Sequence, residues 1–127
     1  MGNPVVHFEI IGNNPSRLRS YYAELFGWDF ETRDAATEAV SQRGNYGFVD
    51  GSAAGDAAAI NGGVGGGDGY ERRVLFYIGV LDVEAALQKA ESLGGARELG
   101  PEGTPGTLVV GRFTDPEGNL IGVAGTA

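Results

Sequence analysis

The chain has 127 residues, of which 42% are hydrophobic and 20% are charged, a balance that fits one globular domain and argues against disorder. The 17 acidic residues outnumber the 9 lysines and arginines and give a net charge of −8. An acidic surface repels phosphate backbones and anionic lipids, so neither nucleic acid nor a membrane surface is an expected partner. The absence of cysteine excludes disulfides, thiolate metal sites and a cysteine nucleophile. No stretch approaches the ~20 apolar residues of a membrane span and the N-terminus lacks a signal-peptide pattern, so we expect a cytoplasmic protein.

The first half of the chain begins with an alternating strand and an amphipathic helix. Residues 5–11 alternate in polarity with the period of a strand. Asn13 or Asn14 is the expected N-cap of a helix with Pro15 in its first turn, and Gly27 is its expected end. The predicted apolar stripe of this helix is Leu18, Tyr21, Tyr22, Leu25 and Phe26. Further strands are expected over residues 28–32, 38–42, 46–49 and 57–61.

Glycine is concentrated near the middle of the chain, with six glycines in the eight residues 62–69. Such a run predicts a flexible linker between two structured halves. It is not a phosphate-binding loop, because no Lys-Ser/Thr pair follows and the next predicted element is a strand rather than a helix.

The second half repeats the pattern of the first. A strand is expected over residues 73–80, then a helix capped by Asp82 and ended by Gly94 and Gly95. The stripe of this helix is Val83, Ala86, Leu87 and Ala90. Strands follow over residues 97–99, 107–113 and 119–123, and the sequence Asp115-Pro116-Glu117-Gly118 predicts a tight turn between the last two. The halves align strand on strand and helix end on helix end, which indicates a duplicated module.

This ordered set of segments resembles the vicinal oxygen chelate superfamily, which includes glyoxalase I, bleomycin-resistance proteins and extradiol dioxygenases. The segments that carry the resemblance are residues 6–10, 21–22, 25–28, 77–80, Asp82, 93–95 and 115–119. The resemblance implies one α+β glyoxalase-like domain, residues 1–127, of two βαβββ modules whose curved mixed sheets surround a cavity. The modules would span about residues 4–62 and 71–124.

The resemblance also implies where a metal would be held, on the first and last strands of each module. His7 stands at one such position and suits a divalent metal. The equivalent positions in the second half are Leu75 and Gly122, and the last strand of the first half offers only Asn61. A catalytic metal normally needs about three protein ligands. We therefore expect no bound metal and no cofactor.

The candidate site residues come from both halves. His7 and Glu9 lie two residues apart on one strand face and form a possible general acid–base pair. The alternative is that His7 is an inert remnant of a metal site. Stacking aromatic rings and polar groups that orient a ligand are expected at Tyr77, Trp28, Asn61 and Arg112.

Three functions are compatible with these residues. The first is a metal-independent protein that binds a small molecule and forms a homodimer, as drug-binding members of the superfamily do. The second is a lyase or isomerase that acts on a small oxygenated compound through His7 and Glu9. The third is a structural homodimer without an open pocket. Whether the protein is an enzyme stays open at this point.

Overall fold

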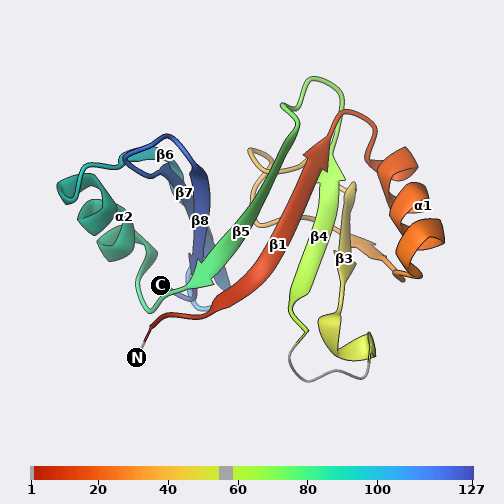
Figure 1. Cartoon of the computed structure of the whole chain (residues 1–127), viewed down its shortest axis with the longest axis horizontal. Helices are drawn as coiled ribbons and strands as arrows, with labels where there is room; N and C mark the ends of the chain where they lie inside the picture. The colour runs from red at the N-terminus through yellow and green to blue at the C-terminus, as the bar shows by residue number, and fades with distance from the viewer. Residues whose placement is uncertain (1, 55–58) are drawn as a thin grey trace. The chain divides into compact units, whose positions relative to one another are not determined.

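Each half of the chain folds into a strand, a helix and three further strands, as Figure 1 shows along its colour ramp. The computed structural model describes residues 2–54 and 59–127. The first half contains β1 (Val5–Gly12), α1 (Pro15–Phe26), β2 (Glu31–Arg33), β3 (Tyr46–Val49), a 3-10 turn η1 (Gly51–Ala54) and β4 (Asn61–Gly66). The second contains β5 (Arg73–Gly79), α2 (Val83–Ser92), β6 (Ala96–Thr104), β7 (Leu108–Thr114) and β8 (Leu120–Gly125). The predicted α+β class and the repeated βαβββ order are confirmed.

The chain divides into two compact units, His7–Val74 and residues 2–6 with Leu75–Ala127. In the first unit the strands lie in the order β2-β3-β4-β1, with β1 parallel to β4 and the other pairs antiparallel. In the second unit the order is β5-β8-β7-β6, with β5 parallel to β8 and the other pairs antiparallel. Each unit therefore holds one mixed four-stranded sheet.

The helix ends follow the capping signals in the sequence. The Asn14 side chain accepts a hydrogen bond from the Arg17 backbone amide and begins α1, and Gly27 ends it with a left-handed φ of 71°. The Asp82 side chain accepts from the Ala85 amide in the same way and begins α2. The turn after β7 also forms as predicted, because the Gly118 amide donates to the Asp115 carbonyl.

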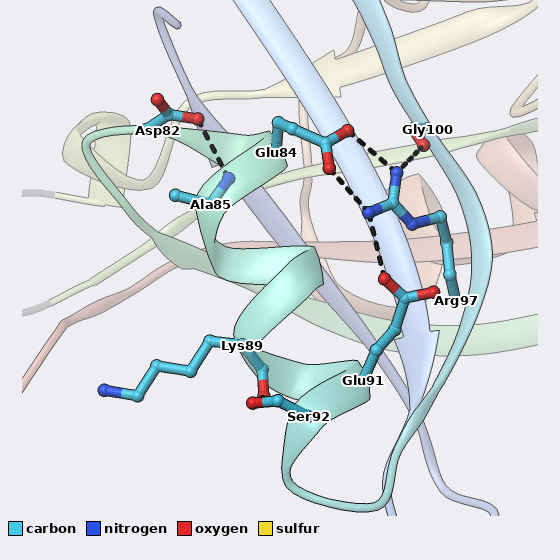
Figure 2. A network of polar contacts seen from close by, with 8 residues as sticks. All are labelled: Asp82, Glu84, Ala85, Lys89, Glu91, Ser92, Arg97 and Gly100. Atoms are coloured by element: carbon cyan, nitrogen blue, oxygen red, sulfur yellow. Dashed lines mark hydrogen bonds and ion pairs between the residues drawn. The ribbon is translucent and has the colours of Figure 1, made fainter.

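Helix α2 is fixed to its sheet by an apolar face and by one arginine. Val83 and Leu87 are fully buried, and pack with strand residues Val109 and Val123. On the polar side, the Arg97 guanidinium on β6 donates to both carboxylate oxygens of Glu84, at 2.9 and 2.7 Å, and to Glu91 at 3.1 Å (Figure 2). Bidentate pairing of this kind favours the ionised carboxylate, so Arg97 lowers the pKa of Glu84 to about 2.

Helix α1 leaves much of its predicted apolar stripe uncovered. Tyr21, Leu25 and Phe26 are 59%, 54% and 57% exposed. The stripe lies on a helix, as predicted, but three of its five residues are more than half exposed. No helix in the described parts of the chain has both the length and the apolar character needed to cross a membrane.

The predicted glycine linker is wrong, because most of it forms the buried strand β4. Bulky side chains from neighbouring elements lie on its glycines: a Cβ at Gly62 would lie 1.9 Å from Cε2 of Phe8. A Cβ at Gly63 would lie 2.0 Å from the Tyr46 ring, and one at Gly65 would lie 2.7 Å from the Ser41 hydroxyl. These glycines serve close packing rather than flexibility. The connection between the modules shortens to residues 67–72.

The remaining strand predictions hold in part. Residues 38–42 form no strand; instead Ser41 is buried and its hydroxyl accepts from the Gly66 amide at 2.9 Å, at the end of β4. The strand expected over residues 28–32 begins only at Glu31, and the one expected over 97–99 extends to Thr104. Residues 57 and 58 of the strand expected over 57–61 lie outside the described residues, and Asn61 begins β4.

Candidate functional site

The register of the first sheet gathers polar side chains on the face that α1 does not cover. His7 and Glu9 of β1 pair with Asn61 and Gly63 of β4, and Phe48 of β3 pairs with Gly63. Paired strand residues point to the same side of a sheet. The α1 side carries the alternate positions, since Leu18 lies on Gly12 and Arg19 lies on Gly47.

Tyr46 joins His7 and Glu9 into one hydrogen-bonded chain. The His7 Nε2 atom lies 2.7 Å from the Tyr46 hydroxyl, which donates to Glu9 Oε1 at 3.0 Å. A phenol has one proton, so a Tyr46 hydroxyl that donates to Glu9 must accept from His7. The hydrogen-bond network thereby assigns the Nε2–H tautomer to His7. Glu9 and Tyr46 are only 2% and 6% exposed, whereas His7 is half-buried, so His7 is the end of this chain that solvent or a ligand can reach.

The imidazole of His7 is neutral at physiological pH. Burial, followed by the positive charge of Arg33, lowers the pKa of His7 to about 4. A group titrating three units below pH 7 is protonated in about one molecule in a thousand. The three residues therefore present a neutral imidazole, a phenol and the carboxyl group of Glu9.

Aromatic rings border this polar chain. The Phe48 ring stacks near His7 with the ring centroids 6.3 Å apart, and the Arg33 guanidinium lies 3.9 Å from the Phe48 centroid. This distance is within the range of a cation–π contact. Gly63 and Gly65 carry no side chain, and the Tyr46 ring occupies the space that their side chains would take.

Two other predicted site residues of this unit are not part of this hydrogen-bonded chain. The Asn61 side-chain oxygen accepts from the Gly51 amide at 3.0 Å and so holds the first residue of the 3-10 turn. Trp28 packs on the α1 side of the sheet, with its ring centroid 5.2 Å from that of Phe8 and 5.6 Å from that of Tyr22. The structure therefore does not bring Trp28 to His7.

In the second unit, Tyr77 and Arg112 lie on either side of Gly122. Tyr77 of β5 and Arg112 of β7 both pair with Gly122 of β8, and a Cβ at Gly122 would lie 2.4 Å from the Tyr77 ring. Arg112 is 4% exposed, and its Nε lies 2.8 Å from Glu98 Oε2. Their face is opposite α2, because Leu87 and Val83 lie on the neighbouring Gly111. Tyr77 and Arg112 thus place an aromatic ring and a polar group on the sheet face opposite α2. In the first unit, the face opposite α1 carries His7, Tyr46 and Phe48 in the same way.

The residues present do not fit the metal site that the family resemblance implies. The Tyr77 ring fills the space that a ligand side chain at Gly122 would need, and Leu75 is a buried hydrocarbon. The described residues hold no group of three or more histidine, cysteine, aspartate or glutamate side chains that would bind a metal ion. His7 and Glu9 instead share the Tyr46 hydroxyl.

Sequence reasoning missed the central role of Tyr46. Tyr46 is 39 residues from His7 in the sequence, so no local pattern links the two. The signal that could have found it is the alternation of Gly63 and Gly65, which leaves one face of a strand open for a large ring.

Two βαβββ modules, each with a helix on one face of a mixed sheet, define a glyoxalase-like α+β protein. The model of the Glyoxalase/Bleomycin resistance protein/Dioxygenase superfamily matches residues 5–123, and the chain belongs to this superfamily. No curated protein matches the chain.

Among solved structures, the chain is similar to a methylmalonyl-CoA epimerase in complex with methylmalonyl-CoA and NH4+. The TM-score is 0.67 at 14% identity, covering 98% of this chain and 95% of that one. A variant of the Streptomyces coelicolor methylmalonyl-CoA epimerase gives a TM-score of 0.66 at 16% identity, with the same two coverages. A hypothetical protein from Bacillus halodurans gives 0.67 at 13% identity, covering 100% and 96%. These similarities show that the chain shares the fold of these proteins.

Proposed function

We propose that the protein binds a small, flat and largely apolar molecule without a metal ion, on the face that carries His7, Tyr46 and Glu9. The single observation that carries the proposal is the hydrogen-bonded chain of these three residues, with its neutral imidazole. Phe48 supports it, because an aromatic ring beside a few fixed polar groups is typical of small-molecule sites. In this proposal the polar chain of His7, Tyr46 and Glu9 orients the ligand, Asn61 remains a predicted contact on the same face, and Trp28 on the α1 side is not a contact. Within the second unit, Tyr77 and Arg112 remain predicted ligand contacts.

The alternative of a lyase or isomerase is less well supported by the same residues. A general base works best when its pKa lies near the working pH, and the pKa of His7 is about 4. The two methylmalonyl-CoA epimerases have similar folds at 14% and 16% identity, which is too distant to carry an activity over. Binding therefore accounts for the neutral imidazole of His7 better than acid–base catalysis does, and we propose binding without a metal ion.

A thermal-shift screen of antibiotics, small acids and divalent metals tests the proposal. A ligand at 100 times its dissociation constant adds about 2.7 kcal/mol to the free energy of unfolding. We expect a flat organic molecule to stabilise the protein, and both Tyr46→Phe and His7→Gln to weaken its binding about tenfold, or about 1.4 kcal/mol, in calorimetry. Tyr21→Phe, which removes the hydroxyl of an exposed tyrosine on α1, is the matched control and should bind normally.

Two results would contradict the proposal. Tight 1:1 binding of Ni, Zn, Co or Mn would show that the site holds a metal after all. A ligand whose affinity is the same in wild type, Tyr46→Phe and His7→Gln would bind elsewhere on the chain.

We also propose that the protein forms a homodimer and acts in the cytoplasm. The exposed side chains of Tyr21, Leu25 and Phe26 on α1 support self-association, because contiguous exposed apolar surface marks interaction sites. The third possibility, a structural homodimer without a ligand, predicts that no compound in the screen stabilises the protein.

A further inference from the structure

A pocket lies in the His7–Val74 unit, on the α1 side of its sheet. It has a volume of about 610 Å³, and its lining comes from the end of β1, the first turns of α1 and the residues that lead into β5. Ile10 lines it from β1, and is one residue out of phase with Glu9, so the two side chains point to opposite faces. The pocket is therefore separate from the His7–Tyr46–Glu9 chain.

The walls of this pocket are mostly apolar. Ile10 and Leu18 contribute branched aliphatic side chains, and Tyr22 contributes an aromatic ring. Such a lining favours the hydrocarbon part of a ligand, because burial of apolar surface yields roughly 25 cal/mol per Å².

Three arginines stand around these apolar walls. Arg17, Arg72 and Arg73 line the pocket, which is three of the nine lysine and arginine residues in a chain of net charge −8. Arg73 pairs with Glu71 at 2.9 Å, and none of the described residues that line the pocket is acidic. Arg17 and Arg72 are exposed, in contrast to Arg112, which is buried against Glu98. The local charge is thus opposite to that of the whole molecule.

The cationic side chains, and not the helix end, make the pocket positive. The Asn14 side chain already accepts from the Arg17 backbone amide at 3.2 Å, so the N-terminus of α1 is capped. An anion at this pocket would be held by guanidinium groups, which bind carboxylate, sulfonate and phosphate oxygens through paired N–H donors.

We infer that this pocket binds a small amphipathic anion, with its aryl or alkyl part on Ile10, Leu18 and Tyr22 and its acidic group between Arg17 and Arg72. The inference concerns a different face from the proposed function and does not depend on it.

Two dyes that differ by one sulfonate test the inference on the full chain. 8-Anilinonaphthalene-1-sulfonate is the anionic probe, and N-phenyl-1-naphthylamine is the same aromatic body without the charge. We expect the sulfonate to bind 1:1 by fluorescence titration, and Arg17→Gln/Arg72→Gln to raise its dissociation constant at least tenfold. We expect the uncharged amine to bind wild type and this variant equally. Raising the salt from 20 to 500 mM is expected to weaken sulfonate binding several-fold, since exposed charges are screened.

The matched control removes the same charge elsewhere. Arg43→Gln/Lys89→Gln replaces two exposed cations outside the pocket, and is expected to change the dissociation constant less than twofold. His7→Gln is expected to bind the sulfonate as wild type does, which separates this site from the proposed one. Equal loss in the control variant, equal affinity for both dyes, no sulfonate binding, or loss of binding in His7→Gln would each overturn the inference.

Discussion

Replacing Gly63 with alanine is expected to lower the free energy of unfolding by about 3 kcal/mol, at the upper end of the usual cost of overpacking. The new Cβ would lie 2.0 Å from both Cζ and the hydroxyl oxygen of Tyr46. Tyr46 cannot simply swing away, because it is 6% exposed and its hydroxyl is bonded to His7 and Glu9. Urea unfolding, followed by the single tryptophan and by circular dichroism, measures the loss.

A control variant and a double variant test whether the Tyr46 ring causes this loss of stability. Gly2→Ala adds a methyl group where no atom lies within 4 Å, and should leave stability unchanged. In a Tyr46→Ala background the Gly63→Ala change should cost far less than it does alone, because the two sites are in contact and their effects are not additive. A cost below 0.5 kcal/mol for Gly63→Ala alone would show that the ring does not lie on Gly63.

The second large effect is a loss of stability as the pH falls from 6.5 to 4. The folded pKa of His7, about 4, is below the ordinary value of 6.5, so the unfolded chain binds a proton that the folded chain does not. Stability is therefore complete above pH 6.5 and falls as the pH drops toward 4. A shift of this size corresponds to about 3 kcal/mol over that range. Denaturant unfolding at closely spaced pH values measures the slope.

Between pH 6.5 and 5, the change in stability reports on His7, because the chain has one histidine. The lowered pKa of Glu84 acts in the same direction, but only below its ordinary value of 4.5 and down to about 2. His7→Gln should therefore remove the dependence between pH 6.5 and 5 and keep the loss below pH 4.5. An equally steep slope in His7→Gln above pH 5 would assign the effect to other groups.

The modules and their helices were predictable from local chemistry. Asn14 and Asp82 cap their helices with their own side chains, and Gly27 ends α1 because glycine adopts a left-handed backbone easily. These properties need no tertiary contact, so the sequence alone predicts them. The structure of the glycine run at residues 62–69 was not predictable, because glycines suit both a flexible linker and a tightly packed strand. What decides between the two is which rings lie on the strand, and Phe8 and Tyr46 are distant in sequence.

The exposed part of α1 shows a second limit of periodicity. A helical spacing of apolar residues predicts one apolar stripe, but it does not say what covers that stripe. Val83 and Leu87 of α2 are fully buried, whereas Tyr21, Leu25 and Phe26 of α1 remain more than half exposed.

The part of the candidate site on β1 was predictable from the sequence, but its link to Tyr46 on β3 was not. His7 and Glu9 share a face because strand side chains alternate, and the sequence alone shows this. Their link through Tyr46 depends on the register of three strands, β1, β4 and β3. In the second module, the register of β5 and β8 places Gly122 beneath Tyr77, so the Tyr77 ring fills the metal position that the family resemblance implies there.

The central claim is that His7 is neutral because it is buried and lies near the positive charge of Arg33, and that its hydrogen bond to the Tyr46 hydroxyl fixes the Nε2–H tautomer. A nuclear magnetic resonance titration of the ring protons and nitrogens tests it directly, since His7 gives the one imidazole signal of the chain. The structure predicts a midpoint at about pH 4 and the Nε2–H tautomer at pH 7. A midpoint near the ordinary value of 6.5, or a proton on Nδ1, would contradict the account.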